Sequence, residues 1–266
     1  VNPEDVKRGL KKETVLVSVI LASSEVGTIE PLAEIARVCR SAGVPLHTDA
    51  VAAAGNIPLD VKELGIDALS LASDQFYGPK GSGALFLKNG TRILPLIDGG
   101  IQEGGRRSGT ENVAGIIGLG KAAELALANL SERADRMRSL RDRLIERFPQ
   151  KVDRVYLTGH REKRLPHHAS FCVEFIEGEA MLLNLDMKGI AASSGSACTS
   201  RALKASHVLL AMGIDHALAQ GSLVFSLIDR TTAEEIDYLL DVFPPIIDRL
   251  RRMSPLYTQF LEEEKT

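Results

Sequence analysis

The chain has 266 residues, a formal net charge of −3, and hydrophobic and charged fractions of 44% and 25%. This composition predicts a folded globular protein, long enough for one large domain or two ordinary ones. The slightly acidic balance excludes the basic surface on which nucleic-acid binding depends. The sequence also lacks an apolar run of the ~18–20 residues that cross a bilayer, so we expect neither nucleic acid nor membrane as a partner.

The three cysteines are Cys39, Cys172 and Cys198. Their odd number and wide spacing favour neither a disulfide framework nor a metal-binding pair. We therefore expect free thiols, no resident metal site and a cytoplasmic location. The first residue is Val1 rather than Met, and we expect the chain to be a piece of a longer protein.

The first half of the chain alternates between strand-like and helix-like segments, which predicts an α/β layer with parallel strands. Apolar runs predict strands at 14–22, 44–47, 67–72 and 83–87, and helical spacing predicts helices at 31–42 and 61–64. Ligands bind beyond the carboxyl ends of parallel strands. We therefore expect Ser23–Glu25, Thr48–Asp49 and Ser73–Gln75 to share one edge of the sheet.

The second half begins with one or two long helices at 112–148, which Pro149 is expected to end. Shorter elements follow: strands at 155–157, 169–175, 189–192 and 222–228, and helices at 178–185, 203–212 and 233–252. We divide the chain into a partial large α/β domain at residues 1–123 and a second part at 124–266. The second part combines a long connecting helix with a small α+β domain.

Cys198 lies in a run of small and hydroxyl-bearing residues from Ser193 to Ser200. Hydroxyls and backbone N–H groups of such a segment can stabilise a thiolate, the nucleophilic form of cysteine. The alternative is a free cysteine that fills a small gap in the core. The polar surroundings favour a reactive thiol, so Cys198 is the candidate catalytic residue.

Two other segments suggest a bound cofactor. Asp49 ends a short buried strand, where its carboxylate can pair with the protonated ring nitrogen of pyridoxal 5'-phosphate (PLP) or simply cap the next turn. Gly104–Asn112 is a glycine-rich basic segment that runs into a helix. Its N–H groups, hydroxyls and guanidinium groups can hold a phosphate, although a glycine loop with surface arginines would have the same sequence.

Together these motifs resemble the cysteine desulfurases of the NifS/IscS type, in the class V aminotransferase family of PLP enzymes. The resemblance is carried in chain order by Glu25–Thr28, His47–Val51, Phe76–Gly81, Gly105–Asn112 and Ser194–Cys198. It implies the PLP-dependent transferase fold of type I. In that fold a large domain with a parallel or mixed sheet is followed by a small α+β domain.

The resemblance also implies roles and partners. Cys198 would attack the sulfur of PLP-bound L-cysteine and carry it as a persulfide, and Asp49 would pair with the pyridine nitrogen. Thr110 would reach the cofactor phosphate across a homodimer interface. A scaffold protein of the IscU/NifU type would receive the sulfur, and Cys198 would at most ligate an iron–sulfur cluster there transiently.

The chain departs from this family where the cofactor is handled. A His-Lys pair, whose lysine forms the Schiff base with PLP, is replaced by Asp74 and Gln75. Because an amide cannot condense with an aldehyde, we expect PLP to bind only non-covalently. Further departures are Ser23 and Ser24 for two asparagines, Ala52 for a glutamine, Ala72 for a phosphate-binding serine and Val224 for the arginine that binds the substrate carboxylate.

Three functions stay open at this point. The first is a cysteine desulfurase that mobilises sulfur from L-cysteine for iron–sulfur cluster assembly, slowed by the loss of its lysine. The second is a non-catalytic sulfur relay or assembly partner that has lost covalent PLP binding. The third is a relic that binds nothing.

Overall fold

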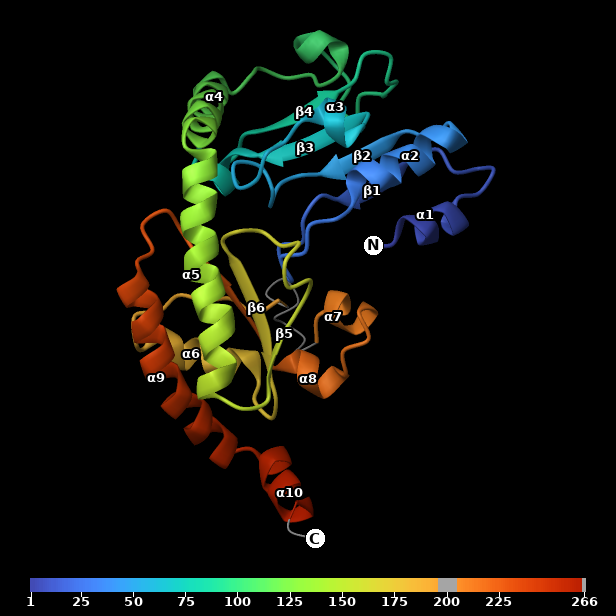
Figure 1. Ribbon diagram of the computed structural model, residues 1–266. Coiled ribbons are helices and arrows are strands. Elements are labelled where there is room, and N and C mark those ends of the chain that lie inside the picture. Colours follow the sequence, from blue (N-terminus) through green and yellow to red (C-terminus); the bar gives the residue numbers. More distant parts are fainter. Residues whose placement is uncertain (196–204, 265–266) are drawn as a thin grey trace. The chain divides into compact units, whose positions relative to one another are not determined.

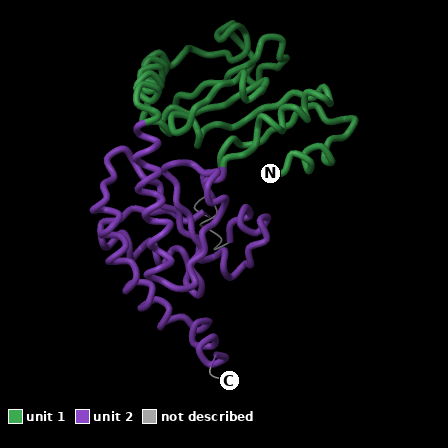
Figure 2. Tube along the Cα trace, in the orientation of Figure 1, with its two compact units in different colours: residues 1–22, 29–131 green, residues 23–28, 132–266 purple. Residues whose placement is uncertain are grey.

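The structure, a computed structural model, describes residues 1–195 and 205–264. The chain forms two compact units, drawn in different colours in Figure 2. Unit 1 comprises Val1–Ala22 and Ile29–Ser131, and unit 2 comprises Ser23–Thr28 and Glu132–Thr266. A short piece of the first half of the chain therefore belongs to the second unit. The expected boundary at residue 123 falls inside the helix α4, Val113–Ala128.

Unit 1 is built on a four-stranded sheet in the order β1-β2-β3-β4 (Figure 1). Its strands are β1 (Val17–Ile20), β2 (Leu46–Asp49), β3 (Ala68–Ala72) and β4 (Gly83–Leu87). The first three strands are parallel, as the alternating pattern predicted, but β4 pairs with β3 in the antiparallel direction. The reason is the short connection between β3 and β4, since a parallel neighbour needs a crossover of roughly a dozen residues or more.

The helices of unit 1 follow the sequence pattern closely. They are α1 (Pro3–Gly9), α2 (Leu32–Ala42), α3 (Val61–Leu64) and α4, with 3₁₀ turns at Ser73–Phe76 (η1) and Gln102–Gly105 (η2). Helix α2 buries Leu32, Ile35 and Cys39 on one face. It ends where Gly43 takes a left-handed conformation with φ of 69°, which a residue with a side chain rarely adopts.

Unit 2 has a three-stranded antiparallel sheet of β5 (Val155–Leu157), β6 (His168–Val173) and β7 (Ser222–Ser226). Its helices are α5 (Leu130–Lys151), α6 (Gly178–Asp186), α7 (His207–Ala211), α8 (His216–Gln220), α9 (Ala233–Arg252) and α10 (Pro255–Glu263). The mixed small domain expected for this part of the chain is thus present.

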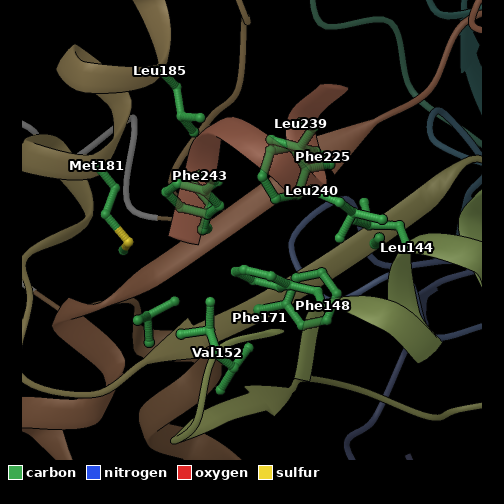
Figure 3. Close-up of a cluster of buried hydrophobic side chains, with 14 of the residues drawn as sticks. Leu144, Phe148, Val152, Phe171, Met181, Leu185, Phe225, Leu239, Leu240 and Phe243 are labelled. Atoms are coloured by element: carbon green, nitrogen blue, oxygen red, sulfur yellow. The ribbon is translucent and has the colours of Figure 1, made fainter. Parts of the chain in front are cut away.

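The two faces of the unit 2 sheet are covered differently. On one face the rings of Phe148, Phe171, Phe225 and Phe243 form an aromatic core (Figure 3), with centroids 5.1 Å apart between Phe148 and Phe171. Side chains alternate between faces along a strand, so Ser170, Cys172 and Val224 lie on the other. Val26, from the short N-terminal piece, packs there against Cys172, together with residues of α7 and α8.

Two predictions are wrong, and two helices were not predicted. Residues 189–192 form no strand, and the next residue, Ser193, makes only an isolated bridge to Val224. Pro149 does not end α5, which continues to Lys151 because the buried Phe148 and Val152 hold its last turn against the core. Helices α8 and α10 are absent from the sequence-based expectation.

Helix length bears on membrane spanning. Within residues 1–195 and 205–264, no single helix is long and apolar enough to cross a bilayer. Helices α4 and α5 reach the length and composition only as a pair, and they are bent by 71° at their junction.

Candidate active site

The carboxyl ends of β1, β2 and β3 lie at one edge of the unit 1 sheet because these strands are parallel. Asp49 is the last residue of β2, and η1 with Ser73–Gln75 follows β3 directly. The sequence prediction of a shared edge is therefore confirmed for these two segments. Ser23–Glu25 also follow the first strand, but they belong to unit 2.

The two carboxylate oxygens of Asp49 have different surroundings. Oδ1 accepts a hydrogen bond of 2.8 Å from the backbone N–H of Val51, so Asp49 does cap the turn after β2. Oδ2 has no hydrogen-bond partner among the described residues. One oxygen is thus left for a protonated ring nitrogen, and the two roles considered for Asp49 are compatible.

His47 stands two residues before Asp49 and therefore on the same face of the sheet. Its Nδ1 lies 2.8 Å from Ser18 Oγ on β1, and its Nε2 lies 2.9 Å from Ser70 Oγ on β3. This row across three strands fixes the imidazole ring. The hydrogen-bonded side chains of Ser18, His47 and Ser70 lie on the same sheet face as Asp49. The sequence analysis did not predict this row.

The position expected to carry the cofactor's covalent anchor holds Gln75. Its side chain is exposed, and its Nε2 donates a hydrogen bond of 3.3 Å to the equally exposed Asp74 Oδ2. The turn that follows Gln75 has a tight backbone. Tyr77 adopts a φ of 67°, and only glycine fits at position 78, because a Cβ there would overlap the buried Ser73 Oγ. The residues present therefore fit the ring-nitrogen end of PLP and lack an amine for its aldehyde.

Thr110 lies in the segment between η2 and α4. The buried Ser108 donates from Oγ to the carbonyl oxygens of Ile97, at 3.0 Å, and Asp98, at 3.1 Å. Asn112 caps α4, its Oδ1 accepting from Gly115 N–H at 3.1 Å. Thr110 is exposed between these two fixed points. Thr110, the residue expected to bind the cofactor phosphate, is therefore accessible to solvent.

Cys198 lies outside the described residues, as do all of residues 196–204. The other two cysteines are core residues: Cys39 is 1% exposed and Cys172 is fully buried. Burial raises the pKa of the Cys172 thiol to about 12 and also raises the pKa of Cys39. Neither thiol is available as a thiolate near neutral pH, which leaves Cys198 as the candidate nucleophile.

Val224 occupies the position at which the resemblance expects an arginine. It is 5% exposed in β7 and pairs with Ser170 of β6. Its backbone forms the bridge to Ser193, with N–H···O distances of 3.0 and 2.6 Å. An apolar side chain cannot replace a guanidinium group as a partner for a carboxylate.

In the part of the chain that the structure describes, no group of three or more histidine, cysteine, aspartate or glutamate side chains could hold a metal ion.

Comparisons with known proteins agree on one family. Residues 1–239 match the model described as Aminotransferase class-V. The chain is 46% identical over 266 residues to "Cysteine desulfurase IscS" of Dictyoglomus turgidum, covering all of this chain and 68% of that protein. It is 48% identical over 267 residues to the protein of the same name from Clostridium botulinum, of which it covers 67%.

Solved structures show the same likeness. A "NIFS-LIKE PROTEIN" superposes with a TM-score of 0.85 at 36% identity, covering 94% of this chain and 66% of that one. A NifS-like protein from Rickettsia africae superposes with a TM-score of 0.86 at 31% identity, covering 93% and 67% of the two chains. The chain spans about two thirds of the length of these relatives, and the fold is theirs.

Proposed function

Because the chain belongs to the class-V aminotransferase family and, within it, to the cysteine desulfurases, we propose that it mobilises sulfur from L-cysteine as a persulfide on Cys198. This proposal rests on the likeness of the chain, over its whole length, to proteins named cysteine desulfurase IscS. The iron–sulfur assembly pathway would receive the sulfur. The two buried cysteines support the assignment of the nucleophile to Cys198, because both are core residues.

The family implies PLP as cofactor. When bound, PLP supplies an electron sink for the bonds of the substrate's carbon atoms. The free Oδ2 of Asp49 suits the protonated ring nitrogen, and Thr110 suits the phosphate. Gln75 offers no amine, so we propose that the cofactor is held non-covalently. The missing lysine is also a missing acid–base group, which costs ~10²–10⁴ in rate.

The sulfur transfer balances without an added oxidant. The Cys198 thiolate forms a bond to the sulfur of the substrate cysteine as the substrate's Cβ–S bond breaks. The electron pair of that bond stays with carbon, which takes up a proton, so that alanine leaves and Cys198 holds the persulfide. The transferred sulfur is oxidised and the substrate carbon is reduced by the same two electrons.

A homodimer is part of this proposal. Leu94, Leu96 and Ile101 are 92%, 97% and 89% exposed in the segment that leads to Thr110. Large apolar side chains left this exposed are candidates for burial against another chain. A second copy packed there would cover these side chains and receive Thr110 at its cofactor site. We place the protein in the cytoplasm, where unpaired cysteines stay reduced, with an IscU/NifU-type scaffold as the sulfur acceptor.

Mass spectrometry tests the proposal directly. The purified chain, incubated with PLP and L-cysteine, should gain the mass of one sulfur atom on the peptide that contains Cys198 and release alanine in equal amount. Cys198→Ser should abolish both signals, and Cys172→Ser is the matched control that keeps them. Absence of persulfide and of alanine from the unaltered chain would contradict the proposal.

A second candidate function is a sulfur relay. Gln75 and Val224, which replace the two groups that anchor cofactor and substrate, favour it. In that case Cys198 would take labelled sulfur from a persulfide donor protein but not from free L-cysteine. The same mass measurement, made with each donor in turn, separates the two functions.

A further inference from the structure

Asn89 and Gly90 form the centre of a tight turn that follows β4. The turn is closed by a hydrogen bond of 3.0 Å from the backbone N–H of Thr91 to the carbonyl oxygen of Lys88. Gly90 has a φ of 93°, whereas Asn89 is not among the residues with a positive φ. A positive φ at the third residue alone is typical of a type II β-turn, in which that residue is normally glycine.

The two reactive groups at the centre of this turn are not engaged elsewhere. Among the residues that the structure describes, the carboxamide of Asn89 has no hydrogen-bond partner, and neither has the backbone N–H of Gly90. Both residues are exposed to solvent. Neither group therefore has to break a bond to the protein before it can react.

Other asparagines of the chain lack this combination. Asn184 lies in α6, donates from Nδ2 to the Ala180 carbonyl oxygen at 2.7 Å, and is followed by a leucine. Asn56 donates from Nδ2 to the Ala52 carbonyl oxygen at 3.3 Å. In the whole sequence only Asn89 is followed by glycine.

We infer that Asn89 is a site of spontaneous deamidation, at which the backbone of the chain supplies the nucleophile. The nitrogen of Gly90 forms a bond to Cγ of Asn89. The side-chain amide nitrogen leaves as ammonia, with the proton that the Gly90 nitrogen gives up, and a cyclic succinimide remains. Water then opens the ring. Opening at Cγ gives aspartate and opening at the backbone carbonyl gives iso-aspartate, and neither step needs an oxidant or a reductant.

Glycine at position 90 makes this reaction sterically possible. A residue without Cβ takes positive and negative φ with similar ease, so the peptide group between Asn89 and Gly90 can rotate until its nitrogen faces Cγ. The two reacting atoms belong to adjacent residues, and intramolecular reactions of well-placed groups are much faster than the same reactions between separate molecules. Because the nitrogen must lose its proton, the reaction should be faster at alkaline pH.

Iso-aspartate at position 89 would change the turn. Its main chain runs through the former side-chain carbon and is one atom longer, so the closing bond between Thr91 and Lys88 is lost. The same two residues fasten the end of β4 to Asp67. The N–H of Lys88 donates to the Asp67 carbonyl oxygen at 2.8 Å, and Thr91 Oγ1 donates to it at 3.4 Å. Deamidation therefore loosens the connection between β4 and the segment after it, and none of these steps requires sulfur transfer or a cofactor.

The test follows the purified chain during incubation at neutral and at mildly alkaline pH. Peptide mapping by mass spectrometry should show the peptide that contains residue 89 change from the mass of the amide to that of the acid, as two isomers of equal mass. Isoaspartyl methyltransferase should label one of the two isomers. Peptides with Asn56 and Asn184 from the same digest are internal controls and should keep their masses.

Variants separate the ring closure from its consequence. Asn89→Gln keeps an amide on a longer side chain that closes a ring poorly, so the mass change should be lost. Asn129→Gln, at an exposed site after α4, is the matched control and should leave the reaction at Asn89 unchanged. Hydrogen exchange at Thr91 N–H should be about fivefold faster in the iso-aspartate form, the effect of losing one backbone hydrogen bond. Freshly prepared Asn89→Asp has the new charge and the original backbone length, and its exchange at Thr91 should be unchanged.

An unchanged mass at residue 89, under conditions in which a peptide of residues 85–93 reacts, would overturn the inference. Aspartate without iso-aspartate would also overturn it, because water would then have attacked the amide without help from Gly90. An equal rate of mass change at Asn56 or Asn184 would show that the turn has no special effect. If Thr91 exchanged equally fast before and after iso-aspartate formation, the loosening of the turn would be refuted.

Discussion

The turn of unit 1 that contains Gln75 and the sheet face of unit 2 that contains Arg164 differ in how their polar side chains are held. Gln75 is exposed, and its side chain bonds only to that of Asp74 among the described residues. Arg164 is buried and donates to Val26 O, Thr158 O and Ser170 Oγ. A substitution at position 75 therefore changes chemistry at little cost to the fold. One at Arg164 would break contacts between segments far apart in the chain.

The largest effect should come from placing a lysine amine at position 75, where the family has its PLP-binding lysine. In Gln75→Lys we expect PLP to be attached covalently after reduction with borohydride, which mass spectrometry detects on the peptide that carries residue 75. The desulfurase rate should rise by ~10²–10⁴, since a positioned acid–base group returns. Asp74→Lys places an amine one residue away and should show neither effect. No attachment in Gln75→Lys would mean that the edge of unit 1 no longer admits the cofactor.

A substitution in the aromatic core of unit 2 should cause a large loss of stability. Phe148 is 1% exposed and packs 5.1 Å from Phe171 and 5.3 Å from Phe243, measured between ring centroids. Phe148→Ala should lower the free energy of unfolding by ~3–5 kcal/mol, because burial is lost and a cavity remains. Urea denaturation followed by circular dichroism measures it. A loss below ~1 kcal/mol would show that the aromatic core can close around the gap.

Two neighbouring histidines whose imidazole rings are largely shielded from solvent, His167 and His168, should make unit 2 sensitive to acid. Burial lowers the pKa of His167 and of His168 to about 4, whereas an unfolded histidine titrates near 6.5. Between these values the unfolded chain binds more protons than the folded one. The stabilisation is therefore complete above pH 6.5 and falls as the pH drops towards 4, by about 2–3 kcal/mol per histidine at pH 4.5.

The measurement compares urea unfolding at pH 7 and pH 4.5. His168→Gln, whose amide can still donate to the Ser24 carbonyl, should lose less stability on acidification than the unaltered chain. His216→Gln, at an exposed site, is the control, because the carboxylates of the protein titrate alike in all three. If His168→Gln lost as much stability between pH 7 and pH 4.5 as the unaltered chain, His168 would not be a cause of the acid sensitivity.

The smallest effect is expected at the turn of unit 1. Asp74→Ala removes an exposed carboxylate whose side chain bonds to that of Gln75 at 3.3 Å. Its free energy of unfolding should stay within ~0.5 kcal/mol of the original. A larger loss would mean that this turn is as tightly bound as the Arg164 face, and the contrast between the two regions would disappear.

Local patterns in the sequence predict most of the regular elements. Apolar runs locate β1 to β4, and the Thr232–Glu235 capping box agrees with the start of α9. The same reasoning fails at 189–192, where Ile190 and Ala192 pack against the core without strand pairing. It also misses α10, because Ser254 and Pro255 indicate the end of α9 and are equally a favourable start for a new helix.

The candidate site was predictable only where it is local. The place of Asp49 at the end of a buried strand follows from the apolar residues before it, and Gln75 is found by its distance from the Tyr77–Gly81 turn. The contact between Glu25 and Ser206 joins residues 181 positions apart. No periodicity or spacing encodes such a contact, since it depends on how distant elements pack.

The insertion of Ser23–Thr28 into unit 2 restricts how this part of the protein can be exchanged between relatives. A gene fragment that begins at residue 132 would encode Arg164 and His168 without the carbonyl groups that they bind. If the C-terminal region were transplanted into another member of the family, Arg164 and His168 would have to bind that protein's counterpart of Ser23–Thr28. Recombination should therefore favour crossovers that bring the matching hexapeptide from the same parent.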